Sequence, residues 1–202
     1  MALRQLLSTL RVRRWAPHLM SPSLEDITRD LAAVCMSDIA PLLTNVDSSS
    51  FRRDIHTLTL ADTAAYSVVV FLLPPHARLP LHDHPSMTVR LRVLHGGVRI
   101  RSFDWAPAPP SAVLVDDSVV TPEDAVIGFS AQGGGVVHSV EATSDGGVFI
   151  DFITPPYGVA PSFIECTYFR EEGGAQKGTS AVLHRLDPPP YVPMVAIPSR
   201  RS

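Results

Sequence analysis

Two histidines separated by one residue, His82 and His84, are the residues whose types and spacing most directly suggest chemistry. On an extended segment, side chains alternate between two faces, so both imidazoles lie on the same side. Imidazole is the side chain that most often binds metal ions in proteins. The pair therefore predicts part of a metal site, and the alternative is two histidines of a surface loop.

Short strands are the elements that must position these histidines. After a turn at residues 85–86, residues 87–94 alternate apolar and polar side chains, as a strand with one buried face does. Residues 95–97 (HGG) are predicted to form a hairpin turn, and residues 98–103 to return as the partner strand. A pair of ligands at the mouth of such a hairpin is one way in which a small barrel holds a metal.

The rest of the chain also has the pattern of short strands bounded by turns. Strands are expected at residues 64–73, 125–130, 136–142, 148–154, 163–169, 181–186 and 191–197. Residues 105–118 are rich in proline and are predicted to be a surface excursion, and residues 132–135 and 144–147 are predicted to be turns. Short strands without intervening helices favour an all-β sandwich or barrel.

Two helices are expected before the strands, packed on the outside of the barrel. Ser23 is predicted to be the N-cap of one, with Asp26 three residues later. Residues 1–22 contain arginines but no acidic residue, and their first leucines share one helical face. This composition fits a mitochondrial targeting segment or an amphipathic basic helix. We therefore divide the chain into an N-terminal segment, residues 1–22, and a main domain, residues 23–202.

Composition excludes several classes of protein. The 202 residues suffice for one domain with a substantial core, and a net charge of −3 argues against a nucleic-acid partner. Only two cysteines are present, far apart in the sequence, so a disulfide framework is not expected and a reducing compartment is favoured. The best apolar run, residues 66–75, is too short to span a membrane.

A third histidine, His138, lies in the segment GGGVVHSVEA, where a glycine-rich turn leads into a predicted strand. With the earlier histidine pair, this segment resembles the two motifs of the cupin double-stranded β-helix, a jelly-roll barrel. Val89 stands where the first cupin motif usually has glutamate, and Gly133 stands where the second usually has proline. The resemblance implies a cupin that binds its metal through His82, His84 and His138 alone.

A site of three neutral imidazoles leaves the metal its full charge and an open face. Such a site suits a borderline metal and anionic incoming ligands, thiolate included. Fe(II) in this setting can take O₂ and a substrate sulfur side by side, and zinc would also accept three histidines. The residue types alone leave the choice of metal open.

The resemblance extends from the cupin fold to one family. The segments PLHDHPSMTV, VLHGGVRIRSFDW, GGGVVHSVEA, FIDFITPPYG and ECTYFRE, in this order, resemble the thiol dioxygenases of the plant cysteine oxidase and 2-aminoethanethiol dioxygenase family. The resemblance covers about residues 23–170, and DPPPYVP resembles the family's C-terminal end. It implies an Fe(2+) cofactor and conversion of a thiol to a sulfinic acid with O₂. The family's substrates are cysteamine or the N-terminal cysteine of proteins, whose oxidation feeds the N-degron pathway and senses oxygen.

Two further residues are site candidates through the same motifs. Asp151 matches the family's aspartate near the substrate, and on its predicted strand it shares a face with Phe149 and Ile153. A carboxylate on an apolar face is costly unless it is paired, so we expect it to hold a substrate amine or a water. The alternative is a hydrogen-bond anchor for a neighbouring turn. Tyr157 matches the tyrosine of P-P-Y and is expected either at the pocket mouth or packed in the turn.

Cys166 and Tyr168 match the family's C-x-Y pair, which is associated with a crosslink in animal members. We favour a small buried cysteine beside a core tyrosine, with a crosslink as the alternative. Ser86 replaces a family glycine, and residues 158–165 lack the family's usual Gly-Arg before C-T-Y-F. These departures leave cysteamine, free cysteine and an N-terminal cysteine peptide all open as substrate.

The resemblance also sets expectations for partners and location. It implies O₂ and a small thiol or protein N-terminus as partners, a monomer, and no nucleic acid or membrane. A cytoplasmic or nuclear location is expected, with mitochondria as the alternative because of the basic N-terminus. The competing function is a cupin-fold metal-binding regulatory module without catalysis. A zinc-dependent isomerase or hydrolase would lack the carboxylate that such sites usually use.

Overall fold

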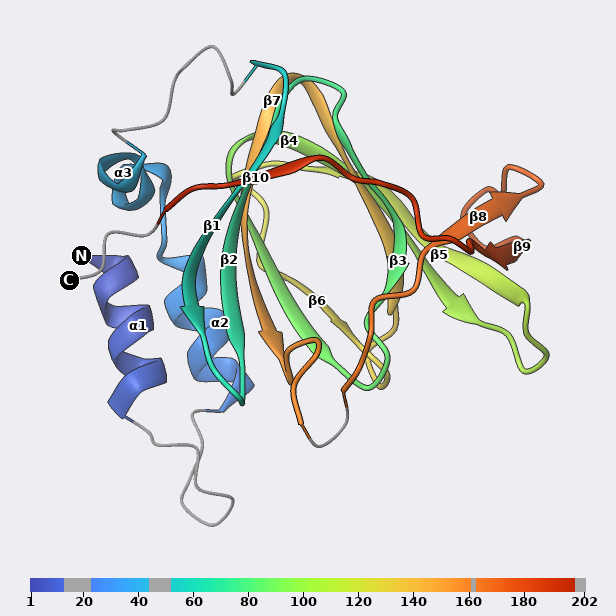
Figure 1. Cartoon of the computed structure of the whole chain (residues 1–202), viewed down its shortest axis with the longest axis horizontal. Coiled ribbons are helices and arrows are strands. Elements are labelled where there is room, and N and C mark those ends of the chain that lie inside the picture. Colours follow the sequence, from blue (N-terminus) through green and yellow to red (C-terminus); the bar gives the residue numbers. More distant parts are fainter. Residues whose placement is uncertain (13–22, 44–51, 161–162, 199–202) are drawn as a thin grey trace.

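The computed structural model describes residues 1–12, 23–43, 52–160 and 163–198. Within these ranges, helices come first and strands follow (Figure 1). The helices are α1 (Ala2–Val12), α2 (Leu24–Ala32), α3 (Met36–Ile39) and the 3₁₀ turn η1 (Ala40–Leu42). The strands are β1 (Ile55–Asp62), β2 (Ser67–Leu73), β3 (Arg78–Asp83), β4 (Thr88–Trp105), β5 (Ser111–Val120), β6 (Ile127–Ser130), β7 (Val137–Thr154), β8 (Phe169–Glu172), β9 (Ser180–Arg185) and β10 (Met194–Ala196).

The strands form one sheet that curls around an interior (Figure 1). Its order is β10-β1-β2-β7-β4-β5-β9-β8, and β3 and β6 pair with β7 and β4. The long strand β7 pairs with β4 along both halves, with β3 along its first half, and with β2 along its second. The curled all-β sheet with helices outside it confirms the predicted fold class.

The glycine-rich segments in β4 and β7 are bends within long strands and not turns between short ones. Gly96 has a φ of +65° and lies opposite Gly147 in the β4–β7 ladder. A Cβ on Gly96 would lie 2.2 Å from the carbonyl oxygen of Gly146, so no larger residue fits this close approach. The predicted hairpin of residues 87–94 with 98–103 is therefore wrong, because both halves belong to β4 and pair with β7. The predicted turn at 144–147 is wrong for the same reason.

Other sequence-based boundaries also change. The predicted excursion at residues 105–118 contains most of β5, because its prolines all precede Ser111 and leave the later amides free to pair with β4. Strand β1 was not predicted, although it pairs with β2 across the sheet. Of the predicted strand at residues 163–169, only Phe169 lies in β8.

The helices lie against the outer side of β1 and β2 (Figure 1). Leu3, Leu6 and Leu10 of α1 are buried in one core with outward-facing residues of β2 and β7. The Ser23 hydroxyl accepts a hydrogen bond from the Asp26 amide at 3.1 Å, so the predicted N-cap of α2 is confirmed. The boundary predicted at residue 22 lies outside the described residues. None of the described helices is both long and apolar enough to cross a membrane.

Candidate metal centre

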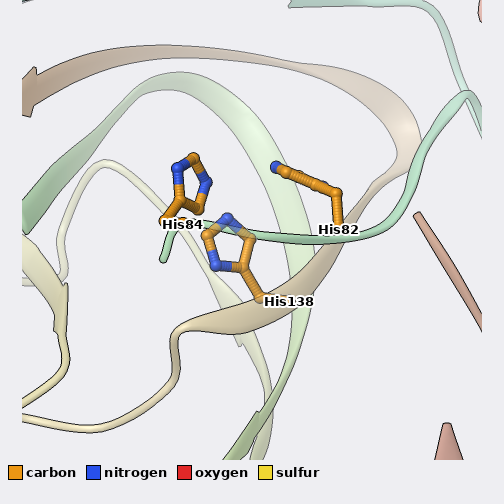
Figure 2. A group of neighbouring side chains, drawn as sticks. All are labelled: His82, His84 and His138. Carbon is orange, nitrogen blue, oxygen red and sulfur yellow. The ribbon is translucent and has the colours of Figure 1, made fainter. Parts of the chain in front are cut away.

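Three histidines from two neighbouring strands meet inside the barrel (Figure 2). His82 lies in β3 opposite His138 of β7, and His84 follows directly after β3. One ring nitrogen from each lies within 4.8 Å of the others, and the ring centroids are 4.8 to 5.0 Å apart. The structure therefore brings the three predicted ligands together. His76 and His95 are exposed and lie outside this cluster.

Asp83, the last residue of β3 and the residue between His82 and His84, anchors the strand. The Asp83 carboxylate accepts a hydrogen bond from the Thr167 amide at 2.8 Å, and the Asp83 amide donates to the Thr167 carbonyl at 3.0 Å. Burial raises the pKa of Asp83. These contacts fix residues 166–168 beside His82, and the alternation of the strand keeps Asp83 away from the cluster.

Carbonyl groups set the tautomers of His82 and His138. The Nδ1 atom of His82 lies 2.8 Å from the Pro80 carbonyl oxygen, and that of His138 lies 3.3 Å from the Gly135 carbonyl oxygen. A carbonyl only accepts hydrogen bonds, so each Nδ1 carries the hydrogen. Each Nε2 then keeps a lone pair, as a metal ligand requires.

Tyr157 sets the tautomer of His84. Its hydroxyl contacts both the Asp83 carbonyl and, at 2.7 Å, the Nδ1 of His84. Because the carbonyl can only accept, the phenol donates to Asp83 and accepts from the Nδ1–H of His84. The Nε2 of His84 is buried and has no hydrogen-bond partner among the described residues. A metal ion would satisfy this atom, so the residues present fit one.

Burial keeps the three imidazoles neutral. It lowers the pKa of His82, lowers that of His138 to about 3, and lowers that of His84 well below its usual range. The neighbouring histidines lower the pKa of His84 and His138 further. A neutral imidazole is the form that ligates a metal, so the cluster is in its ligating state at neutral pH.

A cavity of about 260 Å³ opens beside the three histidines. Its walls are mostly apolar side chains of β2, β3 and β7, together with Asp151 and Tyr157. Asp151 is buried, and its Oδ1 has no hydrogen-bond partner among the described residues. Burial raises its pKa well above the usual range. A carboxylate left without a partner in such a cavity is suited to a cationic ligand group.

Cys166 and Tyr168 also line the cavity, and Tyr168 and Tyr157 partly offset the rise that burial causes in the pKa of the Cys166 thiol. Burial raises the pKa of Cys166 and raises that of Tyr168 to about 12, so both stay protonated at neutral pH. The Tyr168 ring lies 6.1 Å from that of His82. Cys166 and Tyr168 are both half-buried at the cavity, so the predicted buried cysteine beside a core tyrosine is wrong on their burial, and the crosslink stays a prediction.

Sequence reasoning missed three residues at this site. Phe129 of β6 stacks on His138, with ring centroids 4.2 Å apart and an interplanar angle of 28°. Val192 and Met194, close to the C-terminus, line the cavity. The alternation in β6 could have indicated that Phe129 points inward. No local pattern places the C-terminal pair beside residues from the middle of the chain.

Comparisons with known proteins find curated relatives that match about half of this chain. Plant cysteine oxidase 2 of Arabidopsis thaliana is 38% identical over 112 residues, which are 52% of this chain and 40% of that protein. The 2-aminoethanethiol dioxygenase of Homo sapiens is 28% identical over 134 residues, and the match covers 54% of this chain and 49% of that protein. The chain thus spans about half the length of the curated relatives it matches. Among solved structures, KdgF from Halomonas sp. covers 50% of this chain and 79% of its own, with a TM-score of 0.40 and 16% identity.

A family model matches more of the chain than these two relatives do. The model described as PCO_ADO matches residues 21–188, a range that contains all three histidines as well as Asp151, Tyr157, Cys166 and Tyr168. As the sequence motifs predicted, the chain belongs to the PCO_ADO family, that of the plant cysteine oxidases and 2-aminoethanethiol dioxygenases.

Proposed function

We propose that this chain is a non-haem Fe(II) thiol dioxygenase acting on a thiol that also carries a free amine. R–SH and O₂ combine to give R–SO₂H. Both atoms of one O₂ join the sulfur, the sulfur gives up the four electrons that O₂ accepts, and the hydrogen stays with the product. The substrate classes are the N-terminal cysteine of a peptide or protein and cysteamine.

The observation that carries the proposal is the pairing of two unsatisfied features in one cavity. The three imidazoles offer Nε2 lone pairs, and Asp151 offers a buried carboxylate oxygen without a partner. A thiolate suits a metal held by neutral histidines, and an ammonium group suits a buried carboxylate. An N-terminal cysteine and cysteamine both carry their amine two carbon atoms from the thiol.

The residues of the chain bind and orient the substrate. Iron held by His82, His84 and His138 would supply the Lewis acidity and redox capacity that thiol oxidation requires. Asp151 holds the substrate amine and so limits the positions of the sulfur. Tyr157 keeps the His84 imidazole in its ligating tautomer. The apolar walls exclude bulk water from the oxidised thiol.

The relatives support this reaction class through their names, cysteine oxidase and 2-aminoethanethiol dioxygenase. For a protein N-terminal cysteine, the proposed role is oxygen sensing through the N-degron pathway, in the cytoplasm or nucleus. Mitochondria are the alternative location, and the proposed working form is a monomer. Fe(2+) is proposed over zinc because thiol oxidation by O₂ needs a redox-active metal.

The proposed function is tested by mass spectrometry of thiols after aerobic incubation with the iron-loaded chain. The substrates are a peptide with a free N-terminal cysteine, the same peptide acetylated at its N-terminus, and cysteamine. We expect a gain of two oxygen atoms on a thiol with a free amine and none on the acetylated peptide. Equal oxidation of both peptides would refute amine recognition, and no oxidation of any thiol would favour the metal-binding regulatory module.

A further inference from the structure

The segment after β9 crosses the barrel and does not end at its edge. We call residues 187–193 the strap. Just before it, the Leu186 amide donates to the Tyr168 carbonyl at 2.8 Å. Just after it, β10 pairs in parallel with β1, and the Ile197 amide donates to the Thr57 carbonyl at 2.7 Å. In Figure 1 this red segment runs across the strands from β9 to β1.

Proline determines the stiffness of the strap. Residues 188–190 and 193 are prolines, so four of its seven residues have a fixed φ and no amide hydrogen. Such a segment cannot extend the sheet by regular pairing, and it loses little conformational freedom when it folds. Because it is held at both ends and stiff between them, the strap holds one wall of the cavity in place.

Two side chains in and directly after the strap form that wall. Val192 and Met194 line the same cavity as His82 and Asp151. Val192 is half-buried and packs on the interior core, whereas the Met194 residue is 45% exposed. Met194 therefore reaches both the cavity and the solvent, which places it at the cavity rim. Its neighbour Val195 is 46% exposed and does not line the cavity.

The size of the cavity makes this rim important for a peptide. Pockets that enclose drug-sized ligands measure about 300–1,000 Å³, and this cavity measures about 260 Å³. It has room for one thiol-bearing residue, and the rest of a peptide must leave across the rim. Cysteamine has no such continuation and ends inside the cavity.

Resting on the proposed function, we infer that Met194 is a specificity-determining residue that contacts the residue after an N-terminal cysteine. Val69, Phe71 and Ile153 line the cavity with it, so an apolar second residue would be buried against apolar walls. Methionine is flexible and adapts to apolar side chains of different shape. Among the described residues that line the cavity, none is lysine or arginine, so an acidic second residue is left without a counter-charge.

The first experiment compares Met194→Ala with the wild type on two substrates, a peptide beginning Cys-Leu and cysteamine. We expect the ratio of kcat/KM for the peptide to that for cysteamine to fall about five- to tenfold, because a half-exposed apolar contact is lost. Val195→Ala removes a similarly exposed side chain from the other face of β10 and serves as the matched control. An unchanged ratio in Met194→Ala would overturn the inference.

The second experiment does not depend on catalysis. The methyl signal of Met194 in the NMR spectrum, assigned with Met194→Ala, is followed as a Ser-Leu peptide or ethanolamine is added. These probes carry a hydroxyl in place of the thiol and are not oxidised. We expect a shift with the peptide and none with ethanolamine. A chain that oxidises no thiol but shows this shift would refute the proposed function alone, and absence of the shift would overturn the role of Met194.

Discussion

Asp151→Asn separates the role of this carboxylate in substrate recognition from its effect on stability. The substitution keeps the shape of the side chain and removes its negative charge. In the wild type, the carboxylate is buried with Oδ1 unpartnered among the described residues. Leaving a buried polar group unsatisfied costs about 1–3 kcal/mol, and more when it is charged. We therefore expect metal-free Asp151→Asn to be more stable than the metal-free wild type by about 1–3 kcal/mol at neutral pH.

The pH dependence of this gain follows from the raised pKa of Asp151. Its pKa in the unfolded chain is 3.8, and its pKa in the fold is well above that value. Between the two values Asp151 therefore binds more protons in the folded state, and its own contribution to wild-type stability falls as pH rises through this window. Asp151→Asn lacks this loss, so the two stability curves converge at acidic pH and separate as pH rises.

The assay is urea denaturation of the metal-free proteins from about pH 5 to about pH 9. Asp145→Asn makes the same substitution at an exposed position of β7 and should change stability by less than about 0.5 kcal/mol. In the iron-loaded chain, Asp151→Asn should lower kcat/KM for an amine-bearing thiol about 10- to 100-fold, because a charge-assisted hydrogen bond is lost. A less stable Asp151→Asn with unchanged kcat/KM would show that Asp151 anchors the fold and does not bind the amine.

Three further predictions concern the histidine ligands and the packing of α1 against the sheet. Tyr157→Phe removes the acceptor for the Nδ1–H of His84 and should weaken metal affinity about 10- to 100-fold in chelator competition. Equal metal affinity in the variant and the wild type would refute the tautomer assignment. Tyr191→Phe, at an exposed tyrosine, is the control. Leu6→Ala should lower the free energy of unfolding, measured by urea denaturation, by about 2–5 kcal/mol, because Leu6 is fully buried. A loss below about 0.5 kcal/mol would mean that α1 is not packed against the sheet. The metal-free Asp151→Asn chain should lose stability as pH falls below 6.5, because the pKa values of the three histidines are lower in the folded state than in the unfolded state. Constant stability down to about pH 5 would contradict the burial of these histidines.

The parts of the site that obey a local period could be predicted from the sequence. Alternation along a strand placed His82 and His84 on one face and Asp151 on an interior face. The N-cap at Ser23 was also predictable, because the cap and its acceptor lie within one helical turn. These features depend only on near neighbours in the chain.

The features that were mispredicted depend on distant partners. The composition around Gly96 predicts a turn, but Gly147 lies opposite Gly96, and the paired glycines let two long strands bend together. A turn and a bend have the same local composition, so only the pairing of β4 with β7 distinguishes them. Met194 enters the site because the proline-rich strap crosses the barrel and brings β10 into pairing with β1, which no periodicity encodes.

The source of the oxygen in the product tests the central claim most directly. The iron-loaded chain is given a peptide with an N-terminal cysteine under isotopically labelled O₂ in ordinary water, beside His138→Ala treated identically. The account predicts a sulfinic acid in which both oxygen atoms carry the label, and no sulfinic acid from His138→Ala. Oxygen derived from water, or labelled product formed equally by His138→Ala, would contradict a dioxygenase built on these three histidines.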